Sequence, residues 1–411
     1  MKAPLKRTLH TLAALTALAA ANPGSLQAAD KFGGDLDFLR KHAEVVVLSD
    51  KSGHAQVAVA PTWQGRVMTS TAGGPNGTSF GWVNRSLIAS GKIQPHMNAF
   101  GGEDRFWLGP EGGQFSIFFA KGVPFDLKHW FTPASLDTEP FQVASKTASS
   151  VVCKRTIALS NYSGTPFNLE VTRKIRLVNP DSTLSKHGIK RSQETQSVAF
   201  ESVNTIKNTG KQAWTKESGL LSIWILGMFN ASPNAVIIVP FEKGPVSERG
   251  PIVNDTYFGK VPSNRLVVKD NVLFFRADAD YRSKIGISPR RVKPLLGSYD
   301  SSTRTLTLVE FTYSSHAVDY VNSMWKLQTH PFAGDVLNSY NDGPQKPSGL
   351  RMGKFFEMES SSPALALRPG ATATHVHRTI HLQGSEKDLD AIARATLGVS
   401  LAEIKTVFKK Q

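Results

Sequence analysis

Two glutamates near the end of the chain have a spacing that suits acid–base chemistry. Glu357 and Glu359 are two residues apart in an otherwise apolar run. In a β-strand such residues project from the same face, about 6.5–7 Å apart along the backbone. Two carboxylates facing a closed cavity repel each other, so one holds a proton near neutral pH and suits proton transfer to a hydroxyl or glycosidic oxygen. The alternative is an exposed sheet face, where both pair with Arg351 or Lys354.

A glycine-flanked segment in the first third of the chain concentrates charge and an aromatic ring. Glycine pairs at 101–102 and 112–113 permit sharp turns. Indoles stack on the apolar faces of sugars, while carboxylates and guanidinium groups hydrogen-bond sugar hydroxyls. The segment is therefore predicted to bind substrate, and an Arg–carboxylate cluster that only pins a loop is the alternative. Its candidate residues are Glu103, Asp104, Arg105, Trp107 and Glu111.

A polar segment precedes the glutamate run. Its Asn-Asp-Gly-Pro sequence, residues 341–344, has strong turn chemistry, and a turn needs no ligand. The same segment presents many hydrogen-bonding groups, as the rim of a polyol site does. The predicted substrate-binding residues here are Asn338, Tyr340, Asn341 and Asp342, with Asp335 close before them.

Histidines offer a different chemistry. His375, His377 and His381 fall on one face of a regular strand, and His-x-His is a familiar metal-ligand spacing. A third ligand cannot be identified from the sequence, so structural or solvent-facing histidines are the preferred interpretation, and neither a metal nor a cofactor is predicted. His316 and His330 are candidate acids if the fold brings them to the glutamates.

The elements that must position these residues are mainly strands. Short runs rich in Val, Ile, Thr and Phe alternate with Gly, Pro, Asn, Asp and Ser, which is typical of antiparallel sheets. No helical periodicity of comparable length separates them, which disfavours a βαβ architecture. The predicted strands include 44–48, 56–60, 66–71, 115–119, 168–177, 197–206, 235–240, 265–275 and 303–313.

Helices are expected mainly at the C-terminus. Ser385 with Asp388, and Ser400 with Glu403, are helix-start signals, and Gly398 is a stop signal between them. A third helix is expected at 36–43. Without a composition break or internal repeat, residues 29–411 are predicted to form a single domain.

The N-terminus has the layout of a secretory signal peptide. Lys2, Lys6 and Arg7 precede an apolar run of 13 residues, and small residues follow up to Ala28 and Ala29. Because a bilayer-spanning helix needs about 20 residues, stable membrane insertion after cleavage is not expected. Residues 1–28 are therefore predicted to be removed, which places the mature protein in the periplasm or outside the cell.

The net charge restricts the classes of possible binding partner only slightly. The formal charge is +15, or +12 without the three basic residues of the predicted signal peptide. The positive residues are scattered, with their densest clusters at 186–191 and 282–293, and no nucleic-acid-binding motif accompanies either cluster. A solvated basic face is the preferred interpretation, an anionic glycan is the alternative, and no nucleic-acid partner is expected. The single cysteine, Cys153, cannot form an intramolecular disulfide and is expected to be buried.

Several segments together resemble the galactose mutarotase-like (aldose 1-epimerase-like) superfamily. The segment from Phe100 to Gly113 is similar to that superfamily's Gly-Gly-x-x-x-x-Trp-x-x-Pro-Glu pattern. The stretch 355–359, followed by Leu-Arg-Pro-Gly at 367–370, resembles the late strand that carries the catalytic glutamate. Residues 204–210 and 335–344 are similar to further parts of an uncharacterised secreted branch.

The resemblance implies a twisted antiparallel β-supersandwich with a sugar-binding concavity. In mutarotases a glutamate takes the proton of the anomeric hydroxyl and a histidine protonates the ring oxygen. The resemblance thus implies that Glu357 or Glu359 is the base. The family's mid-chain Asn-His is replaced here by Asn204-Thr205, so the acid is sought among His96, His316, His330 and His375.

The predicted function is that of an exported protein that binds a sugar or oligosaccharide. If the protein is an enzyme, it is predicted to be an aldose epimerase-like isomerase that converts this sugar. Two alternatives stay open. One is a glycan-binding protein without catalysis, which the missing mid-chain histidine favours. The other is a metal-dependent glycan hydrolase or lyase built on His375 and His377.

Overall fold

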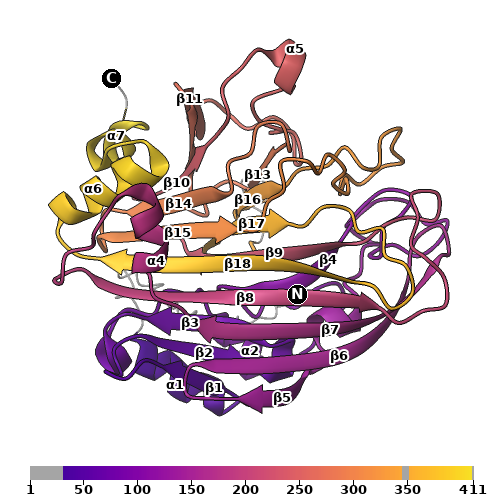
Figure 1. Ribbon diagram of the computed structural model, residues 1–411, viewed down its shortest axis with the longest axis horizontal. Helices are drawn as coiled ribbons and strands as arrows, with labels where there is room; N and C mark the ends of the chain where they lie inside the picture. Colours follow the sequence, from indigo (N-terminus) through magenta and orange to yellow (C-terminus); the bar gives the residue numbers. More distant parts are fainter. Residues whose placement is uncertain (1–30, 345–350, 410–411) are drawn as a thin grey trace, which may run out of the picture.

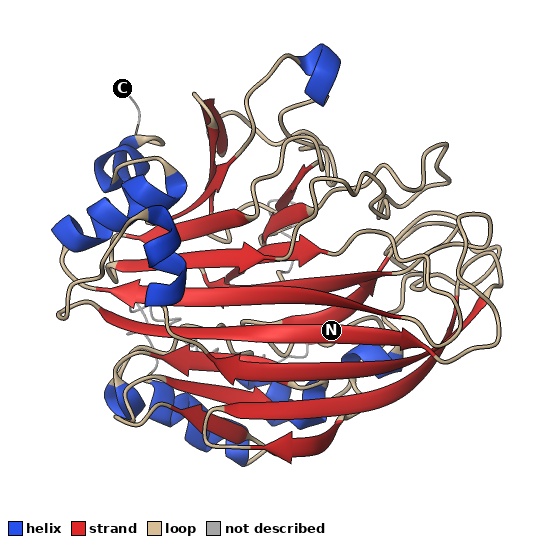
Figure 2. Ribbon diagram, in the orientation of Figure 1, coloured by secondary structure: helices blue, strands red, loops and turns tan. Residues whose placement is uncertain are grey.

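The computed structural model describes residues 31–344 and 351–409 of the 411-residue chain, so the predicted signal peptide lies outside the described residues. Within them, strands form three sheets, and every pairing between named strands is antiparallel (Figures 1 and 2). The predicted mostly antiparallel β-fold is therefore confirmed.

The largest sheet has ten strands and runs from β5 at the bottom of Figure 1 to β11 at the top. Its strands, in spatial order, are β11 (Leu266–Lys269), β12 (Val272–Arg276), β10 (Ala235–Pro240), β14 (Leu295–Asp300), β15 (Thr305–Phe311), β18 (Thr372–Gln383), β8 (Gln196–Asn208), β7 (Pro166–Leu177), β6 (Ser150–Ser160) and β5 (Gln142–Lys146).

A five-stranded sheet packs against the inner face of the large sheet. Its order is β13 (Ser283–Ile287), β16 (Leu337–Asn341), β17 (Phe355–Ser361), β9 (Ser222–Asn230) and β4 (Arg105–Gly109). Phe356 and Met358 on one face of β17 join a buried cluster with Ile237, Leu296 and Val309 of the large sheet. Because side chains alternate along a strand, Glu357 and Glu359 project from the opposite face.

The N-terminal part forms a three-stranded sheet, β1 (Val46–Ser49), β2 (Gln56–Ala60) and β3 (Arg66–Thr71). Its helices are α1 (Phe32–Arg40) and α2 (Arg85–Ser90), and the expected helix at 36–43 thus begins and ends earlier. The remaining short helices are α3 (Ala134–Asp137), α4 (Asp181–Leu184) and α5 (Val246–Arg249), with 3₁₀ turns η1 (Pro61–Trp63), η2 (Gly74–Asn76) and η3 (Ser185–His187).

The two C-terminal helices form where the capping signals predicted them. In α6 (Glu386–Leu397) the Ser385 side chain accepts a hydrogen bond from the Asp388 amide, and Gly398 ends the helix with φ 77°. In α7 (Leu401–Thr406) Ser400 and Glu403 form a capping box. Leu389 and Ile392 of α6 share a buried cluster with Ile380 of β18, so these helices cover the outer face of the large sheet.

Two strand predictions need correction. Residues 115–119 form no named strand, because Phe118 stacks on Trp130 and Phe119 packs edge-on against Trp325, so their apolar side chains build a loop core. The run 265–275 is a hairpin of β11 and β12, because the chain turns at Asp270, which has φ 54°.

Candidate functional site

The register of the five-stranded sheet brings the two glutamates into line with residues distant in the sequence. Glu357 pairs with Tyr340 of β16, which in turn pairs with Lys284 of β13. On the other side of β17, Glu359 is opposite Leu226 of β9, which pairs with Arg105 of β4. Directly paired residues project from the same face. One sheet face therefore carries two acids and two bases from three strands.

Glu359 lies at the centre of this face and is fully buried. Its Oε2 accepts hydrogen bonds from Lys284 Nζ at 3.0 Å and from Trp224 Nε1 at 2.9 Å, while its Oε1 has no partner in the part of the chain that the structure describes. The Lys284 ammonium is also 4.8 Å from the Trp224 ring centroid. A buried ammonium and carboxylate in contact stabilise each other's charge.

Glu357 has different surroundings, although it is on the same strand. Its Oε1 accepts a hydrogen bond from Arg105 Nη2 at 2.9 Å, and Arg105 lies over the Trp107 ring at 4.3 Å. Burial, with repulsion from Glu359 and Asp342, outweighs the attraction of Arg105 and Lys284 and raises the pKa of Glu357 to about 7. Glu357 can therefore accept or donate a proton near neutral pH.

Glu111, from the loop after β4, is the third carboxyl group whose charge acts on Lys284. Burial and the nearby Glu359 raise the pKa of Glu111, and attraction to Lys284 opposes this shift. Burial of Lys284 disfavours its charge, but attraction from Glu359, Glu111 and Glu357 is stronger and raises the pKa of Lys284. Lys284 is thus held as an ammonium ion.

A small cavity opens on this sheet face. It is lined by Gly109, Ser222, Trp224, Tyr257, Lys284, Val321, Ser323, Asp335, Asn338 and Ser361. Tyr257 donates a hydrogen bond to Asp335 Oδ2 at 2.6 Å and accepts one from Asn338 Nδ2 at 3.1 Å. The buried hydroxyl of Ser222 has no partner among the described residues. The cavity has a volume of about 10 Å³, room for about one water molecule, and it is lined by several hydrogen-bonding groups and an indole.

The polar segment before β17 divides between the two faces of β16. Asn338 lines the cavity, and Tyr340, on the same face, donates to Asp342 Oδ1 at 2.8 Å. Asn341 projects from the other face, where it accepts a hydrogen bond from the Ala279 amide at 3.0 Å. Asn341 therefore holds a neighbouring loop, and the structure does not bring it to the cavity.

The glycine-flanked segment also divides. Arg105, Trp107 and Glu111 lie beside the glutamates, whereas Glu103 and Asp104 are buried between sheets. Glu103 bonds His381 Nε2 at 2.7 Å, and Asp104 bonds Arg173 Nη2 at 2.5 Å and Ser202 Oγ at 2.6 Å.

The turn before this segment depends on glycine. Gly102 has φ 109°, and a Cβ there would lie 2.8 Å from the Arg66 side chain. For Glu103 and Asp104 the structure thus supports the alternative of a structural Arg–carboxylate cluster.

None of the four candidate histidines contacts the glutamates within the described residues. His316 and His330 are exposed, and His96 bonds the Trp130 carbonyl through Nδ1 at 2.6 Å. His375 and His377 project between the sheets, where both bond the Ser360 hydroxyl at 2.8 Å. Burial lowers the pKa of His375 to about 3 and that of His377 to about 4, so both are neutral at pH 7.

The described residues contain no group of three His, Cys, Asp or Glu side chains that could hold a metal ion.

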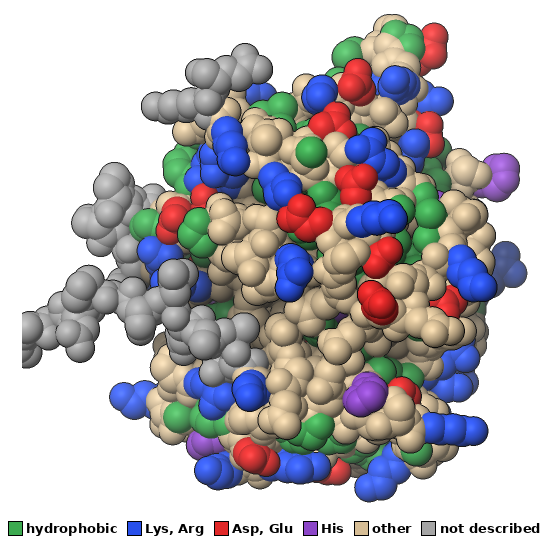
Figure 3. Space-filling view, turned by 90° about the vertical axis from the view of Figure 1, so that its left-hand side faces the viewer, with side chains coloured by type: hydrophobic (Ala, Val, Ile, Leu, Met, Phe, Trp, Pro, Cys, Tyr) green, Lys and Arg blue, Asp and Glu red, His purple; other side chains and the backbone are tan. Residues whose placement is uncertain are grey.

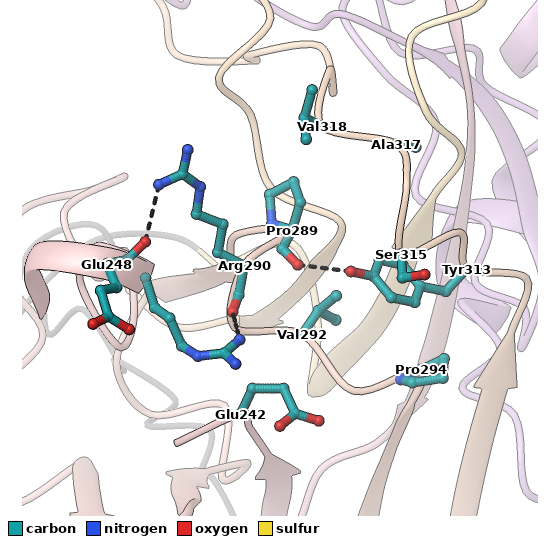
Figure 4. Close-up of a pocket in the computed structure, with 11 residues that line it drawn as sticks. Glu242, Glu248, Pro289, Arg290, Val292, Pro294, Tyr313, Ser315, Ala317 and Val318 are labelled. Atoms are coloured by element: carbon teal, nitrogen blue, oxygen red, sulfur yellow. Dashed lines mark hydrogen bonds between the residues drawn. The ribbon is translucent and has the colours of Figure 1, made fainter. Parts of the chain in front are cut away.

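A wider pocket lies elsewhere, between α5 and the loops around Pro289 and Tyr313 (Figure 4). Its Arg249 and Arg290 donate to the carbonyls of Arg290 and Glu248, both at 2.9 Å, so they brace loops. The described helices include none long and apolar enough to cross a membrane.

Lys284, Trp224 and Tyr257 are site residues that were not predicted from the sequence. Lys284 was counted with the basic cluster 282–293, but it is 8% exposed, and Arg291 of that cluster is 1% exposed. The alternation of Ile285 and Ile287 marks a strand whose other face carries Lys284, a signal that could have separated it from surface lysines. Elsewhere, Lys and Arg are interspersed with Asp and Glu over the face in Figure 3.

Comparisons with solved structures find the same architecture. The Slr1438 protein from Synechocystis sp. PCC 6803 matches with a TM-score of 0.51 and 11% identity, covering 84% of this chain and 96% of that one. A galactose mutarotase-like protein from Lactobacillus casei matches with a TM-score of 0.47 and 11% identity, over 83% and 100% of the two chains. A galactose mutarotase related enzyme from Lactobacillus acidophilus gives 0.46 and 10%, over 83% and 98%.

The likeness to the Slr1438 protein supports the predicted fold, and an identity this low establishes no activity. No curated protein matches the sequence. One family model matches residues 30–408, nearly all of the chain. The chain therefore belongs to the family of unknown function DUF6786.

Proposed function

We propose that this protein binds a sugar on the face of the five-stranded sheet that carries Glu357 and the small cavity, and interconverts its anomers, with Glu357 as the base. The observation that carries the proposal is the convergence of Glu357, Glu359, Lys284 and Trp224 on one buried sheet face beside a cavity. Carboxylates, an ammonium and an indole are the groups that bind sugar hydroxyls and an apolar sugar face.

The choice of Glu357 as base rests on its proton affinity. A general base works best when its pKa is near the working pH, and burial raises the pKa of Glu357 to about 7. Arg105 bonds only Oε1 of this carboxyl group, so Oε2 remains available to the anomeric hydroxyl. Glu359, with its oxygen shared between Lys284 and Trp224, positions neighbouring groups.

The test uses the chain without residues 1–28. Polarimetry on freshly dissolved α-D-galactose, α-D-glucose, lactose and maltose measures the rate of anomer exchange. Glu357→Gln should lower the catalysed rate at least about 100-fold, the usual scale for losing a general base, without unfolding the protein. Glu194→Gln, at an exposed glutamate, is the matched control. Unchanged exchange in Glu357→Gln would remove this residue from the mechanism.

A binding protein without catalysis is the second candidate, because none of the four candidate histidines contacts the glutamates. Calorimetry that shows sugar affinity, together with polarimetry that shows no anomer exchange, would select this candidate.

Export from the cytoplasm remains part of the proposal. N-terminal sequencing of the protein recovered from a periplasmic extract should give a start near Ala28 or Ala29, and an intact Met1 would contradict it.

A further inference from the structure

Anomer exchange needs a proton donor for the ring oxygen as well as a base. The histidines predicted for that role lie at the surface or between the sheets. Lys284 is the cation that lines the cavity. Its backbone is two strands from that of Glu357 on the same sheet face, with Tyr340 between them, and the Lys284 ammonium is near enough to the Glu357 carboxyl group for their charges to attract.

The hydrogen bonds of Lys284 leave donors unused. A lysine ammonium has three N–H groups. Within the described residues Lys284 makes one hydrogen bond, to Glu359 Oε2 at 3.0 Å. The aromatic rings of Trp224 and Tyr257, at 4.8 and 5.6 Å from Nζ, offer no strong acceptor for the other two. In a cavity-lining side chain that is 10% exposed, these donors are available to an oxygen of the ligand.

We propose that Lys284 is the catalytic proton donor to the ring oxygen, an inference that rests on the proposed function. Lys284 would take the role of the mid-chain histidine that Thr205 replaces. Glu359 positions the Lys284 ammonium. The ammonium also faces Glu357, Glu111 and the Tyr257–Asp335 pair from the neighbouring elements, and Arg282 lies directly before β13. This assembly keeps the donor charged between turnovers.

The step balances without any further reactant. The anomeric O–H proton passes to Glu357, and its bonding pair forms the C1 carbonyl as the C1–O5 bond breaks. The electron pair of that bond goes to O5, which takes a proton from Lys284. Glu357 is then neutral and Lys284 is an uncharged amine. Rotation about C1–C2 and the reverse transfers close the ring on the other face and restore both groups.

Two substitutions separate proton donation from charge. Lys284→Arg keeps a cation that can bond Glu359, but a guanidinium does not release a proton in proteins. Lys284→Gln removes both. Each should lower the catalysed exchange rate at least about 100-fold, while Lys284→Arg retains sugar affinity by calorimetry within about tenfold. Lys269→Gln, at an exposed lysine paired with Glu403, is the matched control.

The pH profile gives a readout that a structural role would not change. With Lys284 as donor, the rate rises through about pH 7 as Glu357 ionises, and it stays level at higher pH because the pKa of Lys284 is raised above its already alkaline ordinary value. A histidine donor would make the rate fall above about pH 6.5.

The outcomes are distinct. Full exchange in Lys284→Arg, or a falling limb near pH 6.5, would overturn the donor assignment and leave the proposed function standing. Absence of exchange in the unmodified protein across the sugars tested would overturn both. A loss of exchange in Lys284→Arg and Lys284→Gln, with a flat alkaline limb and an intact control, would support the donor role.

Discussion

At the scale of single residues, the site gives two identical side chains different properties. Glu357 and Glu359 are separated by one residue, but Glu359 shares an oxygen with Lys284 and Trp224, whereas Glu357 is bonded by Arg105 through one oxygen. Environments that separate the proton affinities of neighbouring carboxyl groups are typical of acid–base sites. The spacing of the glutamates could be predicted from the sequence, but their partners could not, since these come from other strands.

The raised pKa of Glu357 predicts a pH-dependent stability. Below about pH 4.5 this carboxyl group is protonated in both folded and unfolded chains. Between pH 4.5 and 7 the unfolded chain loses the proton while the folded chain keeps it, so the stability contribution falls as the pH rises. The stability difference between the unmodified protein and Glu357→Gln should therefore change by up to about 3 kcal/mol between pH 4.5 and 8.

Urea unfolding of both proteins at pH 4.5 and 8 measures this difference. The unmodified protein should lose stability relative to Glu357→Gln at the higher pH. The Glu194→Gln control should show the same pH dependence as the unmodified protein. A difference that is equal at both pH values would mean that Glu357 titrates like an ordinary exposed carboxyl group.

At the scale of elements, β18 and β17 are joined through one hydroxyl. Ser360 bonds both His375 and His377, so the predicted common face of these histidines is correct, but it is turned toward the other sheet. The alternation of β18 could be predicted from its sequence. Which of its two faces meets the five-stranded sheet could not, because Ile380 and Leu382 on the other face are buried as well, beneath α6.

These two histidines predict a loss of stability in acid. Above about pH 6.5 both rings are neutral whether the chain is folded or not. As the pH falls the unfolded chain binds protons, while burial lowers the pKa of the folded rings to about 3 and 4, so folding becomes less favourable. Each ring should cost about 2 kcal/mol between pH 6.5 and 5.

Urea unfolding of His375→Asn and His377→Asn at pH 6.5 and 5 should show a weaker acid loss than the unmodified protein. Glu357 acts in the opposite direction over the same pH range, so only the comparison between variants isolates each group. Exposed His316→Asn is the matched control. An unchanged acid loss in both buried-histidine variants would mean that these rings become protonated within the folded protein.

At the scale of the whole molecule, the site exists because strands distant in the sequence become neighbours. The order β13-β16-β17-β9-β4 places Lys284, Glu357 and Arg105 on one face, although Arg105 and Glu357 are 252 positions apart. Strand patterns and the resemblance predicted the fold class. They could not give this strand order, so Lys284 was assigned to a surface cluster, and Glu103 and Asp104 were assigned to the substrate.

The same architecture predicts what Asp104 does. It joins the two large sheets through Arg173 of β7 and Ser202 of β8, and the side chains of Asp104 and Arg173 are both 0% exposed. Asp104→Asn keeps the shape but leaves the Arg173 charge without its counterion, which typically costs 3–5 kcal/mol for a buried pair. Asp319→Asn, at an exposed aspartate paired with Lys216, should cost less than about 1 kcal/mol.

Two measurements decide whether Asp104 has a structural or a sugar-binding role. One is urea unfolding, and the other is calorimetry with a sugar that binds the unmodified protein. Because Asp104 faces the space between the sheets and Arg105 the opposite side of β4, Asp104→Asn should lower the free energy of unfolding while leaving sugar affinity unchanged under conditions where the variant is folded. A drop in affinity with little loss of stability would return Asp104 to the binding site. That result would also mean that the turn at Gly102 does not separate substrate contacts from the sheet interface.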